Sequence, residues 1–511
     1  MKEKSVGNRH QRGFNTLEII IALALMLVVI VGAVNANISS QYWTITSQTS
    51  NEALYKAKTL IEQLRAVGGA NFQDASSTLR TRSIDPNDSA DTSCITGGLC
   101  YFTKKNVQDI SSCSKFVEGY VEWRIAERYP TTTESLYTNL TNNEEIIALG
   151  GDCALNVPQG DWMASTPTNV GSHSITPVFS TGIDVLQGKT YITSSTSPQL
   201  KIYSIPSAIG NNPSPLGSTV GNNRRLNALD AVRDLATGRT YVFATQYAST
   251  SQLAVFDATD ASNPTLVTER TLSNVVHTGS FPEGWRVFAY GGRLYVTTRE
   301  TSGPELHIFN INAPTQPTEI TSSASELNRT VNDMVVREQI INGTVHRYLF
   351  LAASAGLKEL SVIEVTGDSV AEVQAYDLAG SIDARSIFLI GNRLYVGRAS
   401  GSGPELYVFD ILRLLNGDAT PLGTGEVGAD VHSIRVSGSI VFLGTTRSGE
   451  EFQVWDGDES SWSATTINEG RVSSLSVPRL APLGLDFNTD WVYLLTQSAT
   501  QPELFRVIYT P

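Results

Sequence analysis

The first residues with distinctive chemistry lie near the N-terminus, where one carboxylate stands at the edge of a long apolar run. Residues 19–34 contain no charged side chain, and Glu18 directly precedes them, four positions after Phe14. A carboxylate within the hydrocarbon region of a membrane is costly, so such a residue usually has a function. The segment before it is basic, which is typical of a cytoplasmic flank; its basic residues are Lys2, Lys4, Arg9 and Arg12. We therefore interpret Glu18 as functional, the alternative being a plain membrane anchor in which it has no role.

The order of glycine and apolar segment distinguishes this region from an ordinary secretory signal. A secretory signal is cut after its apolar segment, at a site of small residues. Here Gly13 and Phe14 lie before the segment, so a cut between them leaves the apolar residues on the mature chain. Residues 14–34 supply about the 20 residues that a helix needs to span a bilayer.

Together, the basic leader, Gly13, Phe14, Glu18 and the apolar run resemble the class III signal of type IV prepilins and pseudopilins. The resemblance implies that a prepilin peptidase cuts after Gly13 and methylates Phe14. It also implies that Glu18 is an assembly residue facing the amine of Phe14 on a neighbouring subunit. Expected partners are then other pilin subunits, with the precursor in the inner membrane and the mature protein outside the cell on a pilus. The run through Asn37 lacks the proline usual in major pilins, which favours a minor pilin or a pseudopilin.

Four cysteines cluster in one part of the chain, at Cys94, Cys100, Cys113 and Cys153. An even, clustered set in an exported protein predicts two disulfides. Of the three possible pairings we favour Cys94 with Cys100 and Cys113 with Cys153, a short loop and a long one. A zinc site is the alternative, but the stretch has neither a Cys-x-x-Cys pair nor a histidine.

The elements that must position these residues begin with one long helix. Its apolar positions after the membrane segment recur at helical spacing, and they are Leu54, Ala57, Leu60, Ile61 and Leu64. Gly68 and Gly69 are expected to end the helix. We therefore predict a leader at 1–13, a pilin helix at 14–67 with 14–34 in the membrane before assembly, a small disulfide-bonded β domain at 68–160, and a linker at 161–173.

From residue 174 to 511 the sequence repeats with a period of about fifty residues. Seven segments each carry two short β-branched and aromatic runs separated by a polar turn, and the third and fifth share Gly-Pro-Glu-Leu at 303–306 and 403–406. This pattern is typical of β-propeller blades. The fold class expected is thus an α+β pilin module followed by an all-β seven-bladed propeller, with residues 174–179 completing the last blade. An open solenoid of hairpins is the alternative, and it would leave strand edges unpaired.

One repeat also resembles a known surface module. Leu253-Ala254-Val255-Phe256-Asp257, followed by Asn263 and Pro264, is similar to the LVIVD repeat of bacterial and archaeal surface proteins. The similarity is strong in only some repeats, and Asn310 and Glu364 stand at the Asp place in two others. We interpret these strand-end aspartates as structural, because Asp bonds readily to turn backbone.

No catalytic constellation, metal site or cofactor site emerges, and we expect a protein that is not an enzyme. The histidines occur singly, and His307 is expected to pack within a strand. The acidic stretches 85–91 and 456–459 do not fit a calcium loop. Charged residues flanking the presumed innermost strands could line a polar channel or could simply be solvated strand ends: Asp230, Arg233, Glu283, Arg286, Asp333, Arg337, Asp383, Arg385 and Asp430.

Composition sets the remaining limits. The chain has 511 residues, a formal net charge of −13, 17% charged residues and 41 glycines, which suits a β-rich extracellular protein and argues against nucleic acid as a partner. The function expected is a minor type IV pilin that presents the propeller at a pilus tip for adhesion or for recognition of a surface, glycan or protein ligand. The alternatives are a type II secretion pseudopilin that engages cargo and an exported enzyme anchored by a pilin-like helix.

Overall fold

The fold comes from a computed structural model, and it divides the chain into two compact units that are taken separately here. The first comprises residues 1–70, 75–106 and 117–138, and we call it the helical unit; the second comprises residues 71–74, 107–116 and 139–511, and we call it the β unit. The described residues are 16–70, 72–76, 100–124, 131–150, 153, 161–164, 166–175, 179–206, 211–220, 223–248, 250–275, 283–320, 324–341, 344–354, 358–477, 482–488, 491–496 and 503–509.

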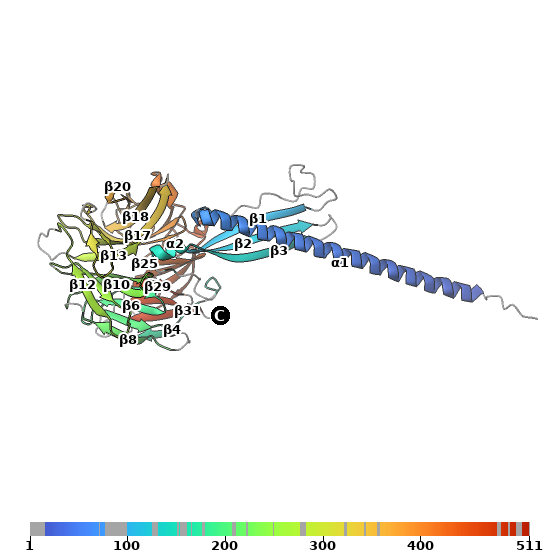
Figure 1. The fold of residues 1–511 in the computed structure, drawn as a ribbon, viewed down its shortest axis with the longest axis horizontal. Coiled ribbons are helices and arrows are strands. Elements are labelled where there is room, and N and C mark those ends of the chain that lie inside the picture. The colour runs from blue at the N-terminus through green and yellow to red at the C-terminus, as the bar shows by residue number, and fades with distance from the viewer. Residues whose placement is uncertain are drawn as a thin grey trace, which may run out of the picture. The chain divides into compact units, whose positions relative to one another are not determined.

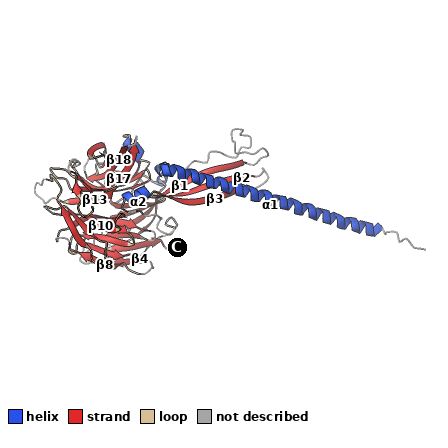
Figure 2. Cartoon of the chain, viewed as in Figure 1, coloured by secondary structure: helices blue, strands red, loops and turns tan. Residues whose placement is uncertain are grey.

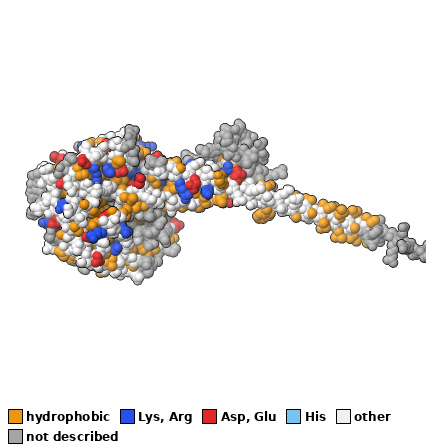
Figure 3. Space-filling view, in the orientation of Figure 1, with side chains coloured by type: hydrophobic (Ala, Val, Ile, Leu, Met, Phe, Trp, Pro, Cys, Tyr) orange, Lys and Arg blue, Asp and Glu red, His pale blue; other side chains and the backbone are white. Residues whose placement is uncertain are grey.

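The helical unit is built on α1 (Thr16–Ala70), a helix of 55 residues and therefore ~80 Å long (Figure 1). Its first half exposes large apolar side chains all along its length, from Leu17 at 61% to Val34 at 51% (Figure 3). Within the described part of the chain it is the one helix long and apolar enough to cross a membrane. Such a helix could serve as a membrane anchor or as part of a signal sequence. The helix was expected to end at residue 67, before Gly68 and Gly69. It instead continues through both glycines and ends at Ala70, less than one turn later.

The second half of α1 packs on an antiparallel sheet in the order β1 (Cys100–Ser111), β2 (Ser114–Arg124), β3 (Thr132–Thr141). Ala53, Ala57 and Leu60 meet Tyr101 and Trp123 in one buried cluster. Most of the predicted apolar stripe is buried there, whereas Leu54 is 44% exposed and was assigned to the stripe wrongly.

Gly119 of β2 shows how closely the helix lies on the sheet. A Cβ atom at this position would come within 2.5 Å of the carbonyl oxygen of Ala57. Only glycine allows two backbones to approach in this way. The contact fixes the register between helix and strand inside the helical unit.

The β unit contains seven four-stranded antiparallel sheets among its described residues (Figure 2). The first three sheets consist of β5 (Ser180–Leu186), β6 (Lys189–Ser194), β7 (Leu200–Ser204) and β8 (Ser214–Thr219); β9 (Leu226–Asp234), β10 (Arg239–Gln246), β11 (Leu253–Asp257) and β12 (Thr265–Arg270); and β13 (Gly284–Tyr290), β14 (Arg293–Thr298), β15 (Leu306–Asn310) and β16 (Thr318–Glu319).

The next three consist of β17 (Thr330–Ile341), β18 (Thr344–Ser354), β19 (Leu360–Thr366) and β20 (Ser369–Tyr376); β21 (Ala384–Ile390), β22 (Arg393–Arg398), β23 (Leu406–Asp410) and β24 (Gly423–Gly425); and β25 (Val431–Ser437), β26 (Ile440–Thr445), β27 (Phe452–Asp456) and β28 (Arg471–Leu475). Short helices lie at α2 (Asn143–Ala148), α3 (Ile411–Leu415), η1 (Phe72–Asp74) and η3 (Glu459–Ser461). Each of these sheets is therefore made from consecutive strands, as the repeat predicts.

The seventh sheet differs, because its outer strand comes from far earlier in the chain. It contains β29 (Pro482–Phe487), β30 (Val492–Thr496), β31 (Leu504–Tyr509) and then β4 (Pro167–His173). The register pairs Leu504 with His173 and Tyr509 with Pro167. The prediction that 174–179 would complete this sheet was wrong, and so was the linker over 167–173. An outer strand can be polar, because its backbone pairing rather than an apolar side-chain pattern holds it in place.

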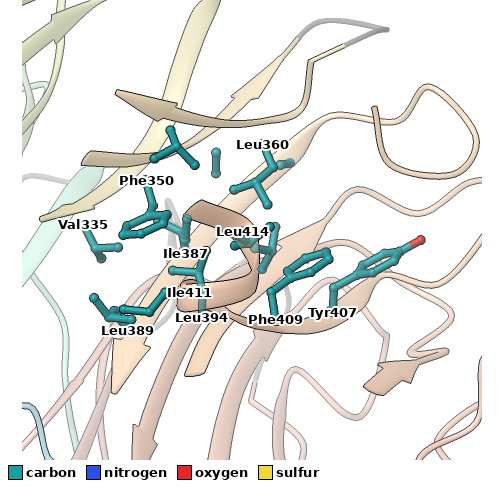
Figure 4. Close-up of a cluster of buried hydrophobic side chains, with 14 of the residues drawn as sticks. Val335, Phe350, Leu360, Ile387, Leu389, Leu394, Tyr407, Phe409, Ile411 and Leu414 are labelled. Carbon is teal, nitrogen blue, oxygen red and sulfur yellow. The ribbon is translucent and has the colours of Figure 1, made fainter. Parts of the chain in front are cut away.

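Apolar layers between successive sheets form the core of the β unit. The first strand of each sheet contacts the first strand of the next, and β29 contacts β5. Figure 4 shows one such layer, in which Phe350 and Val335 of one sheet lie near Ile387 and Leu394 of the next, with Ile411 and Leu414 of α3 beside them. The sheets thus stabilise one another pairwise through side chains.

Candidate ligand-binding cavity

The first strands of the seven sheets share a local irregularity that aligns them with one another. In each of them the register with the second strand shifts by one residue close to the strand's start. A bulge of this kind turns the residue that follows it and the alternate residues after that towards one face. Aligned on the bulge, Asp184, Asp230 and Asp486 occupy the same position in β5, β9 and β29.

All seven first strands line a single cavity of about 730 Å³. Its wall on β29, β5 and β9 carries the three equivalent aspartates, which we call the acid wall: Asp486, Asp184 and Asp230. Two positions before each of them stands a small residue, Gly484, Gly182 or Ala228, and these also line the cavity. No large side chain of these strands therefore fills the space in front of the acid wall.

Each acid-wall carboxylate also joins its sheet to the next one. Oδ2 of Asp486 accepts the backbone N–H of Val185 at 2.7 Å, and Oδ2 of Asp184 accepts that of Ala231 at 2.5 Å. The same bond runs from Ala289 to Oδ2 of Asp230 at 2.5 Å. The three aspartates thus have a structural role, but it uses only one oxygen of each.

The second oxygens of these carboxylates are not equally satisfied. Oδ1 of Asp486 accepts a hydrogen bond from Nε of Arg435 at 3.2 Å. Among the described residues, Asp184 and Asp230 have no such cation and no hydrogen bond to Oδ1. Asp184 is only 6% exposed. The acid wall therefore places more carboxylates than cations in a partly dry space.

This imbalance shifts the protonation of the acid wall. Burial raises the pKa of Asp184 well above its usual range, and the charges of Asp230 and Asp486 add to the effect. Burial likewise raises the pKa of Asp230 to about 7, with the charge of Asp486 adding to it and the Ala289 N–H and Arg435 opposing it. Near neutral pH the acid wall is consequently poised between protonated and charged states.

The opposite wall carries cations that already have partners. Nε of Arg286 donates to the carbonyl oxygen of Asn332, and Asp333 lies close to the same guanidinium. Arg385 forms an ion pair with Asp430, with NH2 3.3 Å from Oδ2. Burial and the charge of Arg385 lower the pKa of His432 to about 4, so this imidazole is neutral at physiological pH.

Between these charged groups the cavity has an apolar face. Phe288, Val335 and Phe388 occupy the position that aspartate holds in the acid wall, but on β13, β17 and β21. Arg435 also lies over the ring of Phe388, with its Cζ 5.5 Å from the ring centre. The cavity therefore offers a carboxylate wall on one side and an aromatic and aliphatic surface on the other.

One end of the cavity is covered by residues 107–116, 139–150 and 153, which we call the cap. Ser111, Ser112, Glu145, Leu149 and Cys153 of the cap line the cavity. The buried Glu145 of α2 accepts a hydrogen bond from the hydroxyl of Tyr290 at 2.7 Å.

Backbone bonds attach the cap to turns that follow the first strands. The Gly438 N–H donates to Ile110, the Arg233 N–H to Gly150 and the Gly291 N–H to Ala148. A disulfide joins Cys113 to Cys153 across the cap, which confirms that predicted pairing. The bulges, with Thr181, Arg385 and His432, lie at the other ends of the strands. The cap therefore covers the end of the cavity that lies away from the bulges.

The sequence identified part of this cavity. Of the nine charged residues proposed for a channel or cap, those that line it are Asp230, Arg286, Asp333, Arg337 and Arg385. Arg233, Glu283, Asp383 and Asp430 do not line it; Glu283 pairs instead with Arg299 at 3.0 Å.

Sequence reasoning missed Asp184, Asp486 and Arg435. Each lies within an apolar strand pattern, where a single charged residue does not stand out. Their position in the repeat could have identified them, because all three occupy the same place in their strands as Asp230 does in β9.

The repeated glutamates have a different and purely structural place. Glu305 of the Gly-Pro-Glu-Leu motif is fully buried, and it accepts backbone N–H bonds from Leu327 at 2.6 Å, Asn328 at 3.0 Å and Thr301 at 3.0 Å. Glu405 accepts two in the same way, from Val427 and Gly428. The motif therefore fastens a loop to its own sheet.

The strand-end aspartates and His307 are structural, as predicted. Oδ1 of Asp257 accepts the N–H of Thr259 at 3.0 Å, and Asp410 caps α3. His307 is fully buried, with Nδ1 2.7 Å from Oε1 of Glu319.

The residues of the pilin-like signal are not tested by these contacts. Gly13, Phe14 and Cys94 lie outside the described residues, as do the side chains of Glu18 and Cys100 and the acidic stretch 85–91. The processing site, the role of Glu18 and the pairing of Cys94 with Cys100 stay predictions. In the described part of the chain, no group of three or more His, Cys, Asp or Glu side chains is arranged to hold a metal ion.

Comparison with known proteins adds one structural likeness. No protein-family model matches the chain, and no curated protein is similar to it. The computationally designed Ika8 protein, known from a crystal structure, is similar at 13% sequence identity with a TM-score of 0.40, over 67% of this chain and 99% of that chain. A TM-score of that size does not establish a common fold.

Proposed function

We propose that this protein is a minor type IV pilin that carries a seven-bladed β-propeller as a binding module. The observation that carries the proposal is the division of α1, which exposes an apolar first half and packs its second half on a small sheet. A helix used in this way suits a subunit that moves from a bilayer into a filament of like helices. The β unit then supplies what the filament presents.

The propeller part of the proposal rests on how the sheets follow one another. Seven sheets of four strands contact their neighbours through first strands, and the seventh contacts the first. β4 comes from before the first sheet and pairs with β31 at the end of the last. Joining the two ends in one sheet is a device that spares a ring of blades its open edges. An open solenoid of hairpins does not require pairing between its first and last strands.

Binding rather than catalysis is the proposed use of the cavity. The acid wall and its facing aromatic surface can recognise a ligand, while the backbone bonds to Asp184, Asp230 and Asp486 hold the carboxylates in fixed positions. Fixed polar groups on rigid strands favour recognition, because little order is lost when the ligand arrives. Adhesion or recognition of a surface is the role we assign to it.

The test begins with processing. In a piliated bacterium that expresses the full chain, the intact mass should correspond to a protein that starts at N-methylated Phe14. A mass that retains the leader would contradict the proposal. A type II secretion pseudopilin would pass this test too, so location must follow.

Location is tested with Glu18→Gln, which keeps the size of the side chain and removes its charge. Insertion and cleavage should be normal because the apolar run and Gly13 are untouched. Recovery in sheared surface pili should fall by tenfold or more, since the ion pair with the amine of Phe14 on a neighbouring subunit is lost (about 1.4 kcal/mol for each tenfold). The matched control is Glu62→Gln, which removes an exposed carboxylate of the same helix paired only with Arg65. Equal recovery of both variants would show that Glu18 is not an assembly residue. Absence of the wild-type protein from pili, with normal cleavage, would favour the secretion pseudopilin.

A further inference from the structure

We propose that the cavity binds a primary ammonium group on an aliphatic body, with Asp184 and Asp230 as its carboxylate partners. The proposal rests on the binding role assigned to the cavity above and names the chemistry of its ligand. The two sources of that chemistry are a free alkyl diamine and the side chain of a lysine.

The first argument is charge. Asp486 is paired with Arg435, Asp333 lies beside Arg286, and Arg385 is paired with Asp430. Asp184 and Asp230 stand next to one another in the wall, and within the described residues neither forms a close ion pair. The charge of Arg435 reaches both only at longer range, and Oδ1 of each accepts no hydrogen bond there. Buried carboxylates are normally paired or fully hydrogen-bonded. A ligand cation is the missing partner that this arrangement accommodates.

The second argument is an independent polar group that lines the same cavity from β25. Ser433 lines the cavity and is 6% exposed, and its hydroxyl has no hydrogen-bond partner in the described part of the structure. A buried hydroxyl without a partner costs free energy. A small shift of this side chain towards a bound polar ligand would satisfy it, as it would the two carboxylates.

The third argument is shape. Gly182 and Ala228 leave space in front of Asp184 and Asp230, while Phe288, Val335 and Phe388 provide an apolar surface for a methylene chain. A volume of about 730 Å³ is within the range of ordinary small-molecule sites. An ammonium group is compact and donates three hydrogen bonds, which suits two carboxylates on adjacent strands better than a planar guanidinium.

The cap limits the form of such a ligand. Since Ser111, Ser112 and Leu149 cover one end, a polymer cannot pass through the cavity. A chain end, a side chain or a small molecule can lie in the cavity and stop against the cap. An alkyl ammonium group, free or on a lysine, has this form.

The experiment uses the full chain in detergent and measures binding by calorimetry. Cadaverine represents a free diamine, lysine blocked at its α-amino and carboxyl groups represents a lysine side chain, and pentanediol is the neutral analogue. Binding of either amine, with pentanediol at least about tenfold weaker, is the expected result, because the diol lacks the charge. The tighter amine identifies the source. Equal binding of the diol, or no binding of either amine, would overturn the proposal.

The variant that tests the assigned residues is Asp184→Asn with Asp230→Asn. Both amides keep an oxygen that accepts the N–H of Ala231 or Ala289, so the sheets should stay joined. Cadaverine affinity should fall by at least about tenfold. The matched control is Asp368→Asn, since that carboxylate is 63% exposed and is not among the residues that line the cavity. The affinity of this variant for cadaverine should be that of the wild type.

Two outcomes separate this proposal from the one on which it rests. A double variant that is at least as stable as the wild type and still binds cadaverine equally well overturns the assignment to Asp184 and Asp230. Recovery of the same variant in sheared pili should be normal, because the cavity takes no part in assembly. Failure of amine binding with normal pilus incorporation therefore refutes the ligand and leaves the pilin proposal standing.

Discussion

Two sets of carboxylates in the β unit occupy similar backgrounds and are used differently. The repeat glutamate Glu305 is fully buried, and three backbone N–H groups satisfy its two oxygens. The acid-wall residue Asp230 receives one N–H, from Ala289, and lies near the carboxylates of Asp184 and Asp486 from two other sheets. Both sets lie at repeated positions of the same structural unit. They differ in how many hydrogen bonds the protein donates to their oxygens.

That difference separates a residue that stabilises the fold from one that is retained at a cost to it. A buried carboxylate whose two oxygens both accept hydrogen bonds organises the loop around it. A carboxylate left half satisfied beside others of its charge is destabilising, and proteins keep such groups mainly at functional sites. Three changes can break or sharpen this contrast.

The largest effect is expected at the satisfied carboxylate. Glu305→Ala leaves three backbone N–H groups without an acceptor in a dry site, so the free energy of unfolding should fall by roughly 2–4 kcal/mol. Thermal melting followed by tryptophan fluorescence measures the change. Glu469→Ala, at an exposed position, is the control and should melt like the wild type.

A milder variant is already present in another repeat. Gln252 stands at the equivalent place, where Oε1 accepts the Leu272 N–H at 3.0 Å and Nε2 donates to Ala248 at 3.1 Å. Glu305→Gln should therefore lose less stability than Glu305→Ala. If the alanine variant had the melting temperature of the wild type, the repeated glutamates would not hold the loops to their sheets as the contacts indicate.

In the acid wall we expect a substitution to raise the free energy of unfolding rather than to lower it. Because the pKa of Asp230 is raised to about 7 in the folded protein, the folded state is more stable when this carboxyl group is protonated than when it is charged. The stability it contributes is complete below its unfolded pKa of about 4 and is lost as the pH rises to 7. Asp230→Asn, always neutral, should thus raise the free energy of unfolding by roughly 1–3 kcal/mol at pH 8 and leave it nearly unchanged at pH 4.

Melting of wild type and Asp230→Asn at both values of pH measures this difference. Asp368→Asn should show no such pH-dependent gain, since its carboxylate is largely exposed. A variant less stable than the wild type at pH 8 would mean that Asp230 stabilises the fold, and the contrast with Glu305 would fail.

The contrast also shows what the sequence could predict. The seven repeats, the two clear strands in each and most of the apolar stripe of α1 follow from periodicity, because side chains that face a core must recur with the period of the element. The structural role of Asp257 and Asp410 follows from local turn chemistry. These are short-range properties, and a sequence records them directly.

The errors and omissions concern groups that long-range pairing brings together. β4 has the composition of a linker, and only its pairing with β31, more than three hundred residues later, makes it a strand. Asp184 lies in an apolar strand pattern, where it does not stand out. It becomes part of the acid wall only because the fold brings Asp486, from the far end of the chain, next to it. The cap was assigned to the small β domain, since nothing local in residues 139–150 indicates the sheets that they cover. An alignment of the repeats on their bulges would have recovered Asp184 and Asp486, but not the cap.

The smallest effect, and the one that joins the contrast to the proposed ligand, is the pH dependence of amine binding. The groups that face Asp230 are Asp184 of β5, Asp486 of β29 and Arg435 of β25, with the Ala289 N–H of β13 bonded to its Oδ2. Arg435 stays charged throughout, and His432 is neutral above its pKa of about 4. Burial also raises the pKa of Glu145 and of Asp333, which line the same cavity. Asp230, with its pKa raised to about 7, gains negative charge between pH 6 and pH 8. Cadaverine stays doubly charged in that range, so its affinity should rise by about threefold to tenfold as Asp230 loses its proton.

Calorimetry of cadaverine at pH 6, 7 and 8 tests the acid wall without altering it. Asp230→Asn should flatten the profile, because the titrating group is gone, and it should bind at pH 8 about as the wild type does at low pH. Asp368→Asn should keep the full rise. An affinity that does not change with pH in the wild type would mean that the acid wall is already fully charged or takes no part in binding. The half-satisfied carboxylates would then resemble Glu305 more than they differ from it.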